Sequence, residues 1–249
     1  MDYNLDGLDR FKQSMYEMAQ AIKKATIDLD ASLRETLLEL ANSINLVGRW
    51  YRTNEILVDN QYVFTSQISS EFIEIILNTN DVDKEVEAYY SKENCKHLHD
   101  LIARCKESLK DSNNCELFNQ SMKAFENKSY QLSCLGLFAI TDGLLSTVSN
   151  QVNPSFTRRL NTIKKRFDET AAFEPIDQQI LSISIALKKM EQSIFSDHDF
   201  HEPELECVNR HWTLHGRSER QYLFTDVIKV LLWIDALLFI LKYDQDHST

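Results

Sequence analysis

Glycine and proline are scarce in this chain, which has 5 Gly and 3 Pro among its 249 residues. Ordinary usage of about 7% and 5% would supply roughly thirty of the two together. Because these residues interrupt helices and form most tight turns, the chain is predicted to be all-α and to fold as a helical bundle. Hydrophobic residues make up 43% and charged residues 26% of the chain, values that exclude a disordered, collagen-like or low-complexity protein.

Apolar residues at helical spacing predict the position of the helices. A long amphipathic helix, or two in series, is expected over residues 8–46. Residues 55–76 mix strand and helix signals and are predicted to be helical. The polar run DSNN at residues 111–114 predicts a break and the domain boundary. We therefore expect an N-terminal helical region over residues 1–112, whose role the sequence does not indicate, and a second helical domain over residues 113–249.

The second domain carries the most apolar segments. Residues 129–148 are almost wholly apolar on one side, and residues 225–243 form the last apolar helix. The longest apolar run, residues 230–241, contains Asp235 and is too short to span a bilayer. No basic segment followed by an apolar run begins the chain, so a cytoplasmic protein without a membrane segment is expected. Five cysteines without a CxxC pair favour buried thiols in a reducing compartment.

Two basic islands stand out in a chain whose net charge is −11. The first contains Arg158, Arg159, Lys164, Lys165 and Arg166. The second contains Arg210, Arg217 and Arg220, together with two histidines. A solvated helix face is one interpretation of each island, and contact with the phosphates of a nucleic acid is the other.

The second island includes the segment NRHWTLHG at residues 209–216. Arg210 offers a permanent cation that can clamp a phosphate, and His215 offers an imidazole that moves a proton near neutral pH. Metal-free cleavage of an RNA backbone needs both groups. Positions five apart on a helix point about 140° away from each other. The two side chains therefore meet only if the helix ends, which Gly216 favours, or if the second subunit of a symmetric dimer supplies one of them.

An Arg, a polar residue and a His after a short spacer resemble the motif of HEPN domains, which are all-helical bundles and often ribonucleases. Arg210, His211 and His215 match that motif with a spacer of four. The segment AFENKSYQLSCLGLFAITDGLLS and the apolar last helix are also similar to that family, so the resemblance covers residues 115–245.

The resemblance implies a homodimeric, metal-independent endoribonuclease without a cofactor, cutting single-stranded RNA or tRNA in microbial phage defence or a toxin system. A neutralising or activating protein partner is also implied. Arg210 and His215 would be catalytic, with His211 or Asn209 orienting them. Asp142 would be an acidic helper, the alternative being a helix-surface or capping aspartate. The second reading of the whole chain is a non-catalytic helical binding or regulatory protein of a defence or toxin–antitoxin complex.

Two further groups of side chains resemble metal ligands. They are Cys95, His97 and His99, and a loop group made of Asp197, His198, Asp199, His201 and Glu202. Alternate residues of a helix lie on opposite sides, and the first group lacks an evident fourth ligand. We therefore predict no metal site and no cofactor. Trp212 is expected to pack against the core rather than to stack on a base.

Overall fold

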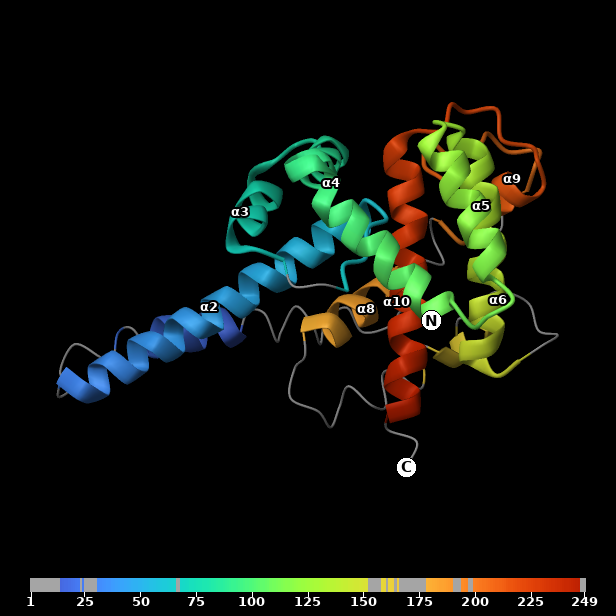
Figure 1. The fold of residues 1–249 in the computed structure, drawn as a ribbon. Coiled ribbons are helices and arrows are strands. Elements are labelled where there is room, and N and C mark those ends of the chain that lie inside the picture. The colour runs from blue at the N-terminus through green and yellow to red at the C-terminus, as the bar shows by residue number, and fades with distance from the viewer. Residues whose placement is uncertain are drawn as a thin grey trace. The chain divides into compact units, whose positions relative to one another are not determined.

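Figure 1 shows the fold in a computed structural model of the chain. The structure describes residues 14–22, 24, 31–65, 68–151, 158–159, 161–163, 165, 178–189, 194–196 and 199–246. These residues form helices and connecting segments without a strand, which confirms the predicted all-α helical bundle. The chain divides into two compact units, Met1–Thr53 and Asn54–Thr249.

Helices make up most of the described residues. They are α2 (Ala31–Asp59), α3 (Ser70–Asn78), α4 (Val82–Leu109), α5 (Cys115–Glu126), α6 (Tyr130–Ser149), α8 (Gln178–Lys189), α9 (Arg210–Leu214) and α10 (Phe224–Asp246). Residues 14–22 are also helical, so the described part of the first unit agrees with the amphipathic helices predicted there.

Helix α10 is the centre of the second unit and lies between α4 and α6 (Figure 1). Every side chain from residue 225 to residue 238 is buried. Most of these side chains are apolar, and a helix that is apolar on most of its circumference is stable only where the rest of the protein covers it. Helix α6 packs on α10, α5 packs on α6, and the short helix α9 contacts α6.

The predicted domain boundary near residue 112 does not coincide with the division between the compact units. Helix α4 precedes that boundary, yet it packs against α10 and belongs to the same unit. The break at residues 111–114 is therefore a turn between two packed helices, α4 and α5.

The predicted helix over residues 55–76 is wrong in its middle. Helix α2 ends at Asp59, and the residues described between it and α3 form a turn followed by residues without regular secondary structure. Tyr62, Val63 and Phe64 are buried there. The β-branched and aromatic residues that gave the mixed signal therefore pack into the core from a connecting segment and not from a helix.

Helices α5 and α6 approach closely at one small residue. A Cβ atom built on Gly136 would collide with Oγ of Ser121 and lie 3.4 Å from its Cβ.

Helix α6 is also the one described helix long and apolar enough to cross a membrane by length and composition. The 18-residue apolar window of this helix is 56% buried inside the protein.

Two ion pairs connect buried charged residues of α10 to partly exposed residues of α4. Asp235 accepts hydrogen bonds from Nη2 of Arg104 at 3.0 Å and from the Thr65 hydroxyl. Nearer the start of α10, Lys229 Nζ lies 2.9 Å from Asp83, which also accepts a hydrogen bond from Tyr62. Burial and the neighbouring carboxylate of Asp83 raise the pKa of Tyr62 far above its ordinary value. These pairs fix α10 against α4. Helix α10 in turn packs against α6, which contacts α9.

Candidate active site

The motif begins with a capped helix. The Asn209 side-chain oxygen accepts a hydrogen bond from the Trp212 amide at 3.2 Å, as an N-cap residue does. Its Nδ2 donates to the backbone oxygen and the hydroxyl of Ser196, at 3.0 and 3.1 Å. The Arg210 amide donates to the Ile194 oxygen at 2.8 Å. Asn209 is buried, so it positions the start of α9 and attaches it to the preceding segment.

The helix ends after five residues, as Gly216 predicts. His215 is the C-cap, and its amide donates to the His211 oxygen at 3.2 Å. Gly216 then takes a φ of +63°, a conformation that glycine adopts without strain. The Thr213 hydroxyl joins the Asn209 oxygen and the Tyr222 hydroxyl, each at 2.7 Å. These bonds fix the one turn that carries the motif's charged and titratable groups.

Asp142 lies between two guanidinium groups. Its Oδ1 is 3.0 Å from Nη2 of Arg159 and 3.6 Å from Nη2 of Arg210. Arg159 also donates to the Asp142 backbone oxygen at 3.0 Å and to the Ser146 hydroxyl. One carboxylate thus faces two guanidinium groups, and it occupies the position at which they could hold an anion.

The imidazoles of His211, within α9, and of His215, at its C-cap, form a cluster around one aromatic ring. The ring centroids of His211 and His215 are 4.6 Å apart. Phe200 stacks on His211 at 4.5 Å and meets His215 edge-on at 5.4 Å. The Arg217 guanidinium carbon lies 4.4 Å from the Phe200 centroid. Trp212 is buried and also meets Phe200 edge-on, at 5.1 Å, so it packs inside the cluster as expected.

Arg210 and His215 therefore have different surroundings within one chain. The guanidinium of Arg210, 14% exposed, contacts Asp142 of α6. His215 is exposed, and its ring lies beside His211 and Phe200. The sequence prediction did not include Phe200. The only available signal was an aromatic residue between charged residues and histidines in the segment DHDFHEPELE.

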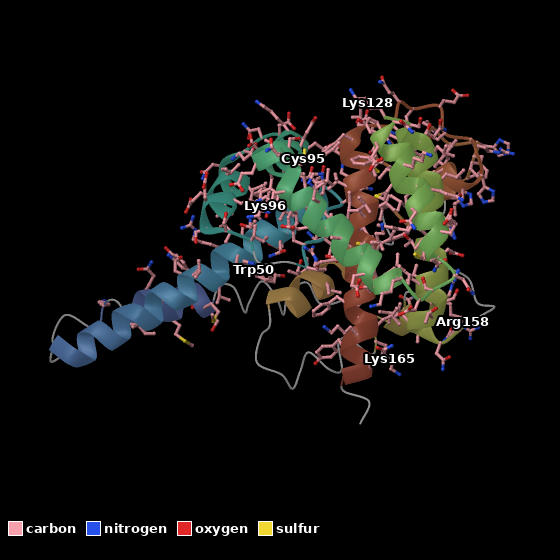
Figure 2. The ribbon with its side chains drawn as sticks, viewed as in Figure 1. Trp50, Cys95, Lys96, Lys128, Arg158 and Lys165 are labelled. Carbon is pink, nitrogen blue, oxygen red and sulfur yellow. The ribbon has the colours of Figure 1, made fainter. Side chains whose placement is uncertain are left out.

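The predicted nucleic-acid-binding residues fall into three groups. Arg158 and Lys165 are exposed, and Figure 2 shows both toward the end of the unit where α10 ends. Arg217 is exposed at the imidazole cluster. Arg159 is buried against Asp142, and Arg220 pairs with Asp226 at 3.1 Å with 17% of its side chain exposed. These two are tied into the fold. Lys164 and Arg166 lie outside the described residues.

The two candidate groups of metal ligands do not form a metal site among the described residues. His97 stacks on Tyr89 with ring centroids 4.2 Å apart, and Cys95 lies in an interruption of α4. No group of three or more metal-ligating side chains occurs within the described part of the chain. Asp197 and His198 of the loop group lie outside that part.

Comparison with known proteins does not assign the chain to a family. No family model, no curated protein and no solved structure matches the chain. Its function is therefore argued from the α9 site itself.

Proposed function

We propose that the protein is a metal-independent endoribonuclease that cuts single-stranded RNA or tRNA at the α9 motif. One observation carries this proposal: a single short helix holds, at its start, a guanidinium in a group organised around an anion and, at its end, an exposed imidazole. A cation that binds the phosphate and a group that transfers protons are what a metal-free site needs in order to cleave an RNA backbone.

The proposed chemistry uses the 2′-hydroxyl of the RNA as the nucleophile. The imidazole of His215 moves a proton during attack or during departure of the leaving oxygen. Arg210 stabilises the charge that develops on the phosphate oxygens, since a guanidinium matches them in a bidentate way. The 3.6 Å contact of Arg210 with Asp142 is longer than the 3.0 Å contact of Arg159. Of the two arginines, Arg210 is therefore the one that can more readily leave Asp142 and bind a phosphate.

The resemblance to HEPN ribonucleases supplies the setting of this proposal. A homodimer would let the Arg210 of one subunit and the His215 of the other face one cleft. A cytoplasmic role in phage defence or a toxin system, with a neutralising or activating protein partner, belongs to the same proposal. Arg158, Lys165 and Arg217 are the exposed cations that would guide RNA.

The test incubates labelled single-stranded RNA and tRNA in EDTA with the wild type, His215→Ala and a matched control, His99→Ala. His99 is exposed on α4, so its removal leaves the site intact. We expect cleavage to a cyclic phosphate by the wild type and the control, and none by His215→Ala. Equal cleavage by all three proteins, or by none of them, would contradict the proposal.

A non-catalytic binding protein is the second candidate, and one observation favours it. Arg210 and Asn209 both make contacts that stabilise the fold, with Asp142 and with Ser196. On this interpretation Arg210→Ala lowers the melting temperature, and there is no RNA cleavage to lose. A folded Arg210→Ala variant that has lost cleavage would favour the enzyme instead.

A further inference from the structure

The pair His211 and His215 is the closest approach of two titratable rings in the described site. The residues lie one helical turn apart, on the same face of α9. Their ring planes are inclined by 56°, so the rings diverge on one side and their nitrogen atoms can address two different oxygens. His215 is exposed and His211 is half-buried, so solvent and substrate can reach the pair.

Phe200 holds both imidazoles in place. It stacks on His211 with an interplanar angle of 23° and meets His215 at 77°. One rigid phenyl ring thus limits the rotation of two side chains that come from a different segment. Such support by packing is what a preorganised proton-transfer site needs.

The charges around the pair favour a phosphate. Arg217 lies against Phe200, and Arg210 starts the same helix with Asp142 of α6 as its partner. Asp199 and His201 flank Phe200 in the chain, and both are exposed. The Arg217 guanidinium thus shares Phe200 with the two imidazoles, whereas the Arg210 guanidinium contacts Asp142 of α6.

We propose that His211 is a second proton-transfer residue, so that His211 and His215 of one chain form a complete acid–base pair; this rests on the RNA cleavage proposed above. One neutral imidazole takes the proton of the 2′-hydroxyl while the bond from the 2′-oxygen to phosphorus forms. The other, protonated, gives its proton to the 5′-oxygen while the bond from phosphorus to that oxygen breaks. The products are a 2′,3′-cyclic phosphate and a 5′-hydroxyl. Water returns the two imidazoles to their starting protonation.

The test measures single-turnover cleavage of a labelled RNA oligonucleotide in EDTA between pH 5 and pH 9. The wild type should give a bell-shaped profile, because an acid and a base are both required. His211→Ala should lose about 100-fold or more in rate and one limb of the profile. Added imidazole should restore part of that rate, which a purely structural role would not allow. His99→Ala should retain the wild-type profile.

Two further variants keep the result interpretable. His211→Asn retains a polar side chain of similar size and replaces the alanine variant if that one does not fold. Phe200→Leu should slow cleavage about tenfold while leaving both limbs of the profile, because it loosens the imidazoles without removing them.

The outcomes separate this inference from the function on which it rests. Cleavage by a folded His211 variant with both limbs and a wild-type rate would overturn the role of His211 and leave the ribonuclease intact. Absence of cleavage by the wild type would overturn both.

Discussion

The carboxylate of Asp142 on α6 lies 3.6 Å from the guanidinium of Arg210, the first residue of α9. The same oxygen atom lies 3.0 Å from Arg159. Only 8% of the Arg159 side chain and 14% of the Arg210 side chain are exposed, against 38% for Asp142. The two arginines therefore share a carboxylate that is itself partly exposed to solvent, and this carboxylate connects α9 to α6.

Asp142→Ala should lower the free energy of unfolding by about 1–3 kcal/mol, because it leaves two largely buried guanidiniums without their shared anion. Asp142→Asn should cost less, since an amide oxygen still accepts a hydrogen bond. Urea denaturation measures both effects. Asp100→Ala, at an exposed position of α4, is the control and should change stability by less than about 0.5 kcal/mol. Equal stability of the Asp142 and Asp100 variants would contradict the ion-pair interpretation.

Asn209→Ala should destabilise the protein by about 1–2 kcal/mol, because it removes the cap of α9 and the two bonds to Ser196 together. Asn209→Ser should fall between that variant and the wild type. A serine oxygen can still accept from the Trp212 amide, but it cannot reproduce both donations of the amide nitrogen. The same urea titration ranks the three proteins. A serine variant no more stable than the alanine variant would show that the bonds to Ser196, and not the cap, carry the effect.

The pair Asp235 and Arg104 should respond asymmetrically to substitution. Asp235 is 9% exposed and Arg104 is 44% exposed. Arg104→Met leaves a buried carboxylate without its cation and should cost about 3 kcal/mol, whereas Asp235→Leu leaves a guanidinium that can reach water and should cost about 1 kcal/mol. The double variant should be closer to the wild type than Arg104→Met. If Asp235→Leu proves the more costly single change, the hydrogen bond from Thr65 would outweigh the ion pair.

Features set by local sequence were predictable from the sequence. Scarce glycine and proline predicted the all-α class, and Gly216 predicted the early end of α9. The apolar run over residues 225–243 predicted α10, which the structure extends to Phe224–Asp246. Each of these features is determined by residues that are close together in the chain, so the residue types and their spacing are enough to predict it.

Features set by long-range packing were not predictable. The contact of α4 with α10 joins segments more than one hundred residues apart, so a turn between helices was taken for a domain boundary. Arg159 and Arg158 are neighbours in one basic island, yet one is buried against Asp142 and the other is exposed. Phe200 lies in an acidic loop, and only the folded chain places it on His211.

Helix α4 contains an interruption with strained backbone conformations, and a glycine should remove the strain at the position that it replaces. Glu93, Asn94 and Cys95 have φ values between +50° and +61°, a region that costs a non-glycine residue about 1 kcal/mol. Glu93 is exposed, so Glu93→Gly should raise the free energy of unfolding by about 0.5–1 kcal/mol. Glu87→Gly, in the regular part of the same helix, should lower it by about 1 kcal/mol. Differential scanning calorimetry compares the two. A loss of stability in both variants would contradict the left-handed conformation at Glu93.

Thiol labelling at pH 8 should divide the five cysteines by burial. Cys105 and Cys134 are fully buried, and burial raises the pKa of each thiol well above its ordinary value. The carboxylate of Asp235 raises the pKa of Cys105 further. Burial also raises the pKa of Cys207. A higher pKa leaves less thiolate, which is the reactive form, so these three should react slowly in the folded protein.

Cys95 and Cys115 are partly exposed and should supply the fast phase of the reaction. The double variant Cys95→Ser, Cys115→Ser should lose that phase, while all remaining thiols should react in denaturant. Cys105 and Cys134 should react most slowly of all, because both are fully buried and a reagent reaches them only when the structure around them opens. Rapid labelling of Cys105 in the native protein would mean that α4 separates from α10 far more often than their shared ion pairs imply. In that case the His211–His215 geometry would have to be maintained by contacts that do not involve α4, which are Phe200, the Asn209 cap and the Asp142–Arg210 pair.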